Sequence, residues 1–133
     1  MSGFHAIHVH NSEHYTWGEV CDGWHLVKDD RLSVIEEEMP PQAAEICHCH
    51  RKSQQFFYIL DGEAELEIDG SRVHLSRGQG IHVPPETCHQ MRNQSTAAVR
   101  FLVISEPPSH GDRVPCIVSL GEHPVIKSRK GDS

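Results

Sequence analysis

Apolar and polar residues alternate with a period of two along most of this chain, and no segment sustains a period of 3.6. The alternation is clearest at residues 63–68, where three apolar residues alternate with three glutamates, and it resumes at 73–75 after Asp69-Gly70. Because Asp and Gly tolerate the positive φ angles of a type I′ turn, this pattern predicts a β-hairpin.

Further strands are predicted wherever apolar or aromatic runs lie between turn signals such as Asp61-Gly62 and Pro84-Pro85; these runs lie at residues 7–9, 32–34, 55–60, 80–83, 99–104 and 116–118. Short strands with closely spaced turns are typical of an all-β sandwich or barrel. The 133 residues fit a single domain, 1–133. We expect a core over about 30–105, an N-terminal arm over 1–29 and a C-terminal extension over 106–133.

Side-chain direction along the predicted strands follows from the same period of two. Phe57 and Ile59 share the parity of Gln55, so all three are expected to line the interior. The acidic run at residues 36–38 is expected to be a solvated strand end. Arg100 interrupts an apolar strand; facing inward it could hold a carboxylate or phosphate, and facing outward it would be solvated.

Charge and end sequences exclude some partners. The chain has 12 Lys and Arg against 19 Asp and Glu, a formal charge of −7, which argues against general nucleic-acid binding. The longest apolar stretch, residues 97–104, is too short to span a bilayer, and residues 1–5 lack the pattern of a secretory signal. We therefore expect a cytoplasmic protein with neither a nucleic-acid nor a membrane partner.

The five cysteines cannot all pair within one chain, and reduced thiols are the expectation for a cytoplasmic protein. Cys47 and Cys49 flank His48 without forming a Cys-x-x-Cys pair. They are expected to be packing thiols rather than metal ligands. The segment His110–Arg113 is expected to form a structural turn, with a catalytic loop as the alternative.

Three of the 12 histidines have the spacing of metal ligands. His48 and His50 lie on one face of a predicted strand, where two neighbouring imidazoles can converge on one ion. His89 follows the Pro84-Pro85 turn and would supply a third imidazole from a distant strand. Imidazole suits zinc, copper, iron and nickel, and oxygen ligands also admit manganese.

These residues lie in two motifs, through which the chain resembles the cupin superfamily. The family's first motif, G(X)5HXH(X)3–4E(X)6G, is matched by His48-Cys49-His50, Gln55 and Gly62, and its second, G(X)5PXG(X)2H(X)3N, by Gly78, Pro84, His89 and Asn93. The matches cover residues 48–93, about a third of the chain. Three positions depart from the pattern: Gln42 and Glu86 replace glycines, and Gln55 replaces the carboxylate ligand.

The resemblance implies a double-stranded β-helix, or jelly-roll barrel, with a divalent transition metal near one mouth. His48, His50 and His89 match the family's imidazole ligands, and Gln55 matches its oxygen ligand; Zn, Mn, Fe, Ni and Co are all compatible. Gln54 is the rival for the oxygen ligand, but it lies one residue away and would face the opposite side. The resemblance also implies a homodimer.

The neutral side chain of Gln55 leaves a divalent ion at its full +2 charge and favours Lewis-acid chemistry. Some cupins that act on sugar acids are similar in their His-His-Gln-His set, and the chain looks like small cupins described as mannose-6-phosphate-isomerase-like. The expected function is isomerase- or lyase-type chemistry on a small anionic or sugar-like substrate. A metal-dependent dioxygenase, a non-catalytic ligand-binding or sensing module and a metal-free structural protein are the alternatives. His82 is a candidate acid or base, with a surface or packing role as its alternative.

Overall fold

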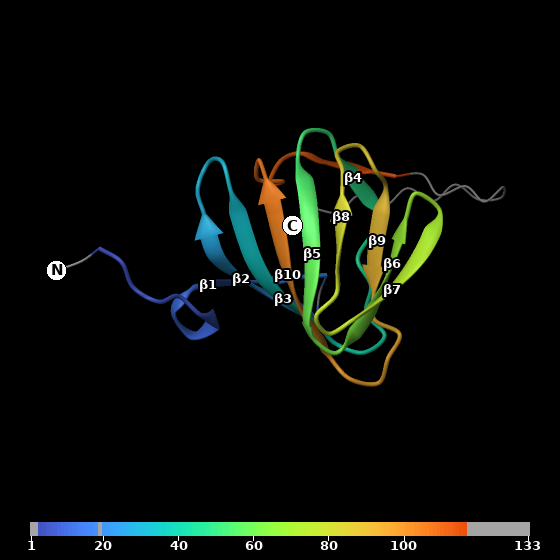
Figure 1. The fold of residues 1–133 in the computed structure, drawn as a ribbon, viewed down its shortest axis with the longest axis horizontal. Helices are drawn as coiled ribbons and strands as arrows, with labels where there is room; N and C mark the ends of the chain where they lie inside the picture. Colours follow the sequence, from blue (N-terminus) through green and yellow to red (C-terminus); the bar gives the residue numbers. More distant parts are fainter. Residues whose placement is uncertain (1–2, 19, 117–133) are drawn as a thin grey trace.

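Two antiparallel β-sheets face each other in this computed structural model, which describes residues 3–18 and 20–116. The six-stranded sheet has the order β1-β2-β3-β10-β5-β8, and the five-stranded sheet has the order β11-β4-β9-β6-β7 (Figure 1). A short 3-10 helix, Val9–Asn11, precedes the strands. The strands are β1 (Glu13–Trp17), β2 (Cys21–Lys28), β3 (Ser33–Met39), β4 (His48–His50), β5 (Gln54–Asp61), β6 (Glu63–Ile68), β7 (Ser71–Ser76), β8 (Gly80–Val83), β9 (His89–Arg92), β10 (Val99–Glu106) and β11 (Arg113–Pro115). The prediction of an all-β jelly roll is confirmed.

The hydrophobic core lies between the two sheets and follows the predicted alternation. Along β10, Val99, Phe101 and Val103 are buried, whereas the residues between them are only partly buried. Phe57 and Ile59 of β5 are buried against this row, as the sequence predicts. Leu66 and Met91 belong to the same core cluster from the five-stranded sheet. The core thus fixes the face that each strand turns inward.

The predicted hairpin is present as β6 and β7. Six residue pairs join the two strands, and the turn consists of Asp69 and Gly70, whose φ angles are 51° and 86°. Both angles are positive, as a type I′ turn requires.

The N-terminal part of the chain adds two strands to the six-stranded sheet. β1 pairs with β2, β2 pairs with β3, and Cys21 belongs to the hydrophobic core. The strand-forming part therefore starts at Glu13, earlier than the expected core boundary near residue 30. The C-terminal extension is described only as far as Cys116, and the end of the strand predicted at 116–118 lies outside the described residues.

The acidic run of β3 is not a wholly solvated strand end, and that expectation is wrong for Glu37. Glu36 and Glu38 face outward, but Glu37 is buried and accepts a hydrogen bond from the Tyr15 hydroxyl at 2.7 Å. This donor comes from β1, which lies on the far side of β2 from β3, so the partner of Glu37 could not be identified from the sequence of β3 alone.

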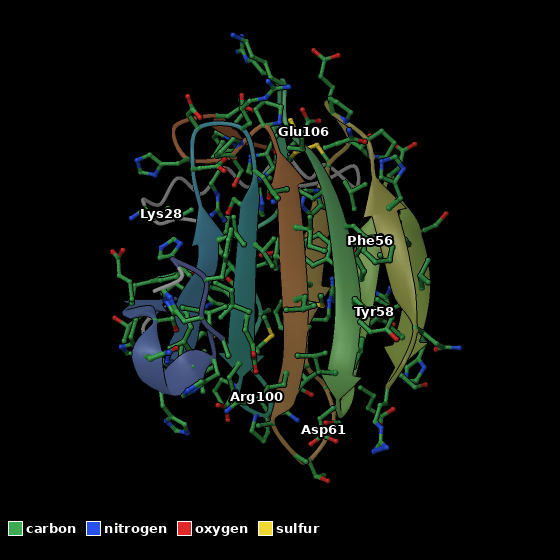
Figure 2. The ribbon with its side chains drawn as sticks, turned by 60° about the vertical axis from the view of Figure 1, so that its left-hand side comes forward. Lys28, Phe56, Tyr58, Asp61, Arg100 and Glu106 are labelled. Atoms are coloured by element: carbon green, nitrogen blue, oxygen red, sulfur yellow. A yellow bond between two sulfur atoms is a disulfide. The ribbon has the colours of Figure 1, made fainter. Side chains whose placement is uncertain are left out.

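Arg100 faces outward on the six-stranded sheet (Figure 2). Its guanidinium binds the carboxylates of Glu36 at 2.7 Å and Glu38 at 3.1 Å and lies 5.0 Å from the centre of the Trp24 ring. Of the two orientations that the sequence allows, the outward one is therefore correct.

Along the described part of the chain, no helix has the length and apolar character that a membrane crossing needs. The cytoplasmic location stays a prediction from the sequence.

The positions where the two motifs call for glycine all have positive φ, whatever residue occupies them. Gly62 and Gly78 have φ angles of 89° and 82°, and the non-glycine residues Gln42 and Glu86 have 71° and 63°. A left-handed backbone costs a side-chain-bearing residue about 1–2 kcal/mol. The two replacements therefore keep the turns of the fold at a local cost in stability.

Gly62 and Gly70 offer a matched test of these turns. A Cβ at Gly62 would lie 2.7 Å from the carbonyl oxygen of Ala98, whereas nothing lies within 4 Å of a Cβ at Gly70. We expect Gly70→Ala to lower the free energy of unfolding by about 1 kcal/mol, for backbone strain alone. Gly62→Ala should lower it by at least about 2 kcal/mol, because a steric clash adds to the strain. Urea unfolding followed by tryptophan fluorescence measures both values, and equal losses would contradict this account.

Candidate metal centre

Three imidazoles converge between the sheets. His48 and His50 project inward from β4, and His89 projects from the neighbouring strand β9, where it pairs directly with His48. One ring nitrogen from each histidine lies within 4.8 Å of the others. The three side chains are almost fully buried, at 1%, 2% and 1% exposure. The structure thus brings together the three histidines that the spacing singled out.

Backbone carbonyls set the tautomers of two of these rings. Nδ1 of His48 lies 2.7 Å from the carbonyl oxygen of Ile46, and Nδ1 of His89 lies 2.9 Å from that of Thr87. A carbonyl oxygen only accepts, so Nδ1 carries the proton and donates it in both residues. Nε2 of each ring is left with a free lone pair, which is the form that binds a metal ion.

The three histidines are neutral at neutral pH. Burial is the largest cause, and it lowers the pKa of His48 to about 2 and the pKa values of His50 and His89 to about 4. The neighbouring imidazoles and Arg113 lower the pKa of His48 further, because protonation would add a positive charge beside them. Protons therefore do not compete with a metal ion for these nitrogens near neutral pH.

Gln55 lies on the inward face of β5 and is 2% exposed. Its amide nitrogen donates to the Ser105 hydroxyl at 3.0 Å, and its amide oxygen is buried without a hydrogen-bond partner. The rival residue Gln54 lies on the outer face, where it binds His82 and Glu106. Of the two glutamines, only Gln55 has an oxygen free toward the interior.

Several buried polar atoms at this site have no partner in the described part of the chain. They are both ring nitrogens of His50, Nε2 of His89 and the amide oxygen of Gln55. Unpaired buried polar atoms are rare in folded proteins because each one costs desolvation energy. A divalent metal ion would satisfy a lone pair on each of these side chains, so the residues present fit such an ion. A mixed nitrogen and oxygen donor set accepts Zn, Mn, Fe, Ni or Co.

Asp112 holds the turn that joins two ligand-bearing strands. Its carboxylate accepts hydrogen bonds from the backbone N–H groups of Arg51, Lys52 and Ser53 at 2.9–3.1 Å. Burial acts to raise the pKa of Asp112, but these N–H groups lower it below its ordinary value. The turn fixes His50 relative to Gln55, and this contact agrees with the structural role expected for the segment His110–Arg113.

Arg113 was not predicted as a site residue. The half-buried guanidinium lies 3.2 Å from Nδ1 of His48, which already donates to a carbonyl and cannot accept a second proton. No carboxylate in the described ranges lies within ion-pair distance of Arg113. The pairing of β11 with β4 brings Arg113 to the histidines, and the sequence alone gave no sign of this pairing. The site thus contains a cation that forms no direct ion pair among these residues, and the buried Glu45 is a carboxyl group that it acts on from a longer distance.

The structure does not support His82 as an acid or base in the cavity. Val83 of β8 is buried, and by strand alternation the exposed His82 points to the opposite, outer face. Nε2 of His82 lies 2.9 Å from the amide oxygen of Gln54. The sequence alone left the face of this strand open, and its pairing with β5 decides it.

A cavity of about 550 Å³ opens between the β2–β3 loop and the β10–β11 loop, and the residues that line it include Tyr15, His25, Lys28, Ser33, Pro107 and His110. Ser33 pairs with Ser105, the residue that receives the Gln55 hydrogen bond. Ser33 in the cavity wall is therefore connected to the candidate ligand Gln55 through a single residue, Ser105. The volume of the cavity suits a small molecule.

The expectation that all five cysteines are reduced thiols is wrong for one pair. Cys88 and Cys116 form a disulfide, and Cys21, Cys47 and Cys49 are free. Twenty-eight residues separate the bonded cysteines in the sequence. The pairing of β4 with both β9 and β11 brings them together, which the spacing along the chain did not indicate.

Comparisons with known proteins agree with this geometry. The profile of the family described as Cupin domain matches residues 35–105, more than half of the chain. The uncharacterized protein MJ1618 of Methanocaldococcus jannaschii is 30% identical over 88 residues, which cover 65% of this chain and 70% of the relative. Quercetin 2,3-dioxygenase of Bacillus subtilis is 31% identical over 99 residues, 66% of this chain but only 29% of that enzyme.

The fold also matches a solved structure described as a sugar phosphate isomerase of the cupin superfamily from Silicibacter pomeroyi. The TM-score is 0.70 at 16% sequence identity, and the match covers 77% of this chain and 76% of that one. The family profile, the jelly-roll topology and the histidine group from β4 and β9 lead to one conclusion. The chain belongs to the cupin family.

Proposed function

We propose that this protein is a metal-dependent enzyme that acts on a small anionic or sugar-like substrate by isomerase- or lyase-type chemistry. The observation that carries the proposal is the uncharged donor set: three neutral imidazoles and the free amide oxygen of Gln55, all buried between the sheets. His48, His50, Gln55 and His89 would hold the ion. A bound divalent ion would supply Lewis-acid polarisation of a substrate carbonyl or hydroxyl oxygen.

The charge balance of the site favours an anionic substrate. A carboxylate at position 55 would neutralise part of the ion's charge, but Gln55 does not. Arg113 adds a guanidinium near His48 that forms no ion pair with a carboxylate of the described residues, although it lies close enough to the buried Glu45 to act on its pKa. Both features support binding of a carboxylate or phosphate group next to the ion, and Arg113 would orient that group.

A metal-dependent dioxygenase is the second candidate, because one relative with 31% identity is described as a quercetin 2,3-dioxygenase. The two candidates use the same residues and differ in whether dioxygen is consumed. Oxygen uptake by the iron-loaded protein in the presence of a chelating substrate would favour the dioxygenase. A non-catalytic ligand-binding or sensing protein would bind small anions and convert none of them.

Metal retention tests the ligand set. We expect the untagged protein to bind about one divalent ion per chain, and His48→Ala combined with His89→Ala to abolish binding, because each substitution removes a ligating nitrogen. His8→Ala, at an exposed histidine of the N-terminal segment, is the matched control and should leave the metal content unchanged. Elemental analysis after purification measures all three. Full retention in the double variant, or a wild type that cannot be loaded, would contradict the proposal.

Anion binding tests the role of Arg113. Inorganic phosphate binding to the metal-loaded protein should weaken by at least about tenfold in Arg113→Gln, the loss expected for one charge-assisted hydrogen bond. Arg72→Gln, at an exposed arginine of β7, is the control and should bind phosphate like the wild type. Titration calorimetry gives the affinities, and elemental analysis confirms that both variants keep the ion. Equal phosphate affinity in the wild type and Arg113→Gln would refute this role.

We also propose a homodimer formed through the outer face of the six-stranded sheet. Phe56 and Tyr58 project from this face of β5 with their rings stacked, at 38% and 36% exposure (Figure 2). Charged residues of both signs, Arg100 and Glu106 among them, lie on the neighbouring strand β10, so the face can complement a second copy of itself.

The dimer proposal predicts that replacing both Phe56 and Tyr58 with Ser shifts the protein from dimer to monomer in analytical ultracentrifugation. Val20→Ser removes an apolar side chain that is 60% exposed in another part of the chain and should leave the dimer intact. A wild-type protein that sediments as a monomer would overturn the proposal.

A further inference from the structure

Three cysteines gather on the side of β4 that faces away from the histidines. Cys49 lies between His48 and His50, Cys88 directly precedes His89, and Cys116 follows β11. The three Sγ atoms all lie within 4.8 Å of one another. Cys88 and Cys116 form the disulfide, whereas Cys49 beside them is free.

Strand pairing holds this cluster in place. β4 is flanked by β11 on one side, with Cys49 paired to Val114, and by β9 on the other. The backbone N–H of Cys116 donates to the carbonyl oxygen of Cys47 at 3.3 Å, which extends the contact one residue beyond β11. Cys116 itself is buried, at 7% exposure. The three sulfurs therefore come from three segments that the sheet positions independently of the disulfide.

We propose that Cys49, Cys88 and Cys116 form a second metal site, for a thiophilic divalent ion such as Zn²⁺, that is available only when the disulfide is reduced. Zinc–sulfur bonds of about 2.3 Å place tetrahedrally arranged sulfurs about 3.8 Å apart. The observed spread of no more than 4.8 Å is close to that arrangement. Water would complete the coordination, and the histidine group keeps its own ion.

The redox step requires a two-electron reductant, such as a dithiol. The dithiol gives two electrons and two protons, so that the Cys88–Cys116 bond becomes two thiols and the reductant becomes a disulfide. The ion then binds the three sulfurs as thiolates, and their protons are released to solvent. A disulfide oxidant reverses both steps: it takes two electrons from the Cys88 and Cys116 thiolates and two protons from solvent and becomes two thiols, and the re-formed disulfide releases the ion because its sulfurs no longer offer thiolates.

The proposed cysteine site and the histidine group lie on opposite sides of one strand, β4. Cys49 and the two histidines next to it occupy opposite faces of β4, and Cys88 and His89 are adjacent in the chain. The same backbone thus carries a nitrogen-rich group on the inside and a sulfur group on the outside. The soft ligands of the outer group favour zinc or cadmium over manganese or magnesium, which distinguishes it from the inner group.

Cadmium binding to the full chain tests the proposal, because thiolate-to-cadmium charge transfer gives a near-ultraviolet absorption that imidazole ligands do not give. The phosphine-reduced protein should show this absorption with saturation at one thiolate-bound cadmium per chain. The oxidised protein still contains Cys21, Cys47 and Cys49 and should not show it. No absorption in the reduced protein, or equal absorption in both forms, would overturn the proposal.

Variants identify the ligands. Cys49→Ser should weaken cadmium binding at this site by more than about tenfold, since one of three thiolates is lost. Cys47→Ser, in the residue before β4, is the matched control and should bind as tightly as the wild type. Unchanged affinity in Cys49→Ser, or an equal loss in Cys47→Ser, would refute the assignment.

Two further double variants control for misfolding and distinguish the cysteine site from the histidine group. Cys88→Ser combined with Cys116→Ser keeps Cys49 but should lose the absorption in both redox states. The His48→Ala and His89→Ala double variant should keep it, so that failure of the histidine site and failure of the cysteine site give different results. Loss of the absorption in the histidine variant, with its thermal unfolding temperature unchanged, would contradict a separate site.

Discussion

The antiparallel pairing of β4 with β9 is the contact on which the rest of the site depends. It places His48 opposite His89, and the period of two then turns His50 to the same side and Cys49 to the other. β4 is only three residues long, so outside contacts must hold it: β11 pairs along its free edge, and Asp112 binds the turn that follows it. A one-residue slip of this strand would exchange the two faces and remove the histidines from the interior.

Much of this arrangement could be predicted from local sequence. The hairpin at Asp69-Gly70, the inward residues of β5 and the convergence of His48, His50 and His89 followed from alternation and motif spacing. Alternation also separated Gln55 from Gln54, because neighbouring residues of a strand face opposite sides. What the sequence left undecided depends on which strands pair: the outward direction of Arg100 and His82, the Tyr15–Glu37 contact, the disulfide and the position of Arg113.

The three departures from the motifs are of two kinds: two concern the backbone of a turn, and one concerns the charge of the site. Gln42 and Glu86 stand where the family pattern has glycine, yet both adopt the positive φ that the pattern implies. The main chain of Glu86 donates to the carbonyl oxygen of His50 at 2.6 Å, so its turn remains tied to the ligand-bearing strand. These two replacements add strain to the turns but keep the positive φ that the turns need. The third departure, Gln55, keeps the backbone and changes the charge of the site.

That change in charge has a consequence for the whole interior. Burial already opposes protonation of the three histidines, and the nearby guanidinium of Arg113 lowers the pKa of each of them further. A divalent ion bound by neutral ligands would add two positive charges to the same low-dielectric region, where charge interactions are poorly screened. Arg113 acts to lower the pKa of the buried Glu45, but burial is the larger cause and raises it to about 7, so Glu45 offsets this charge only in part. An anion from outside the chain would complete this electrostatic balance, which is the physical reason why the proposed metal site favours an anionic substrate.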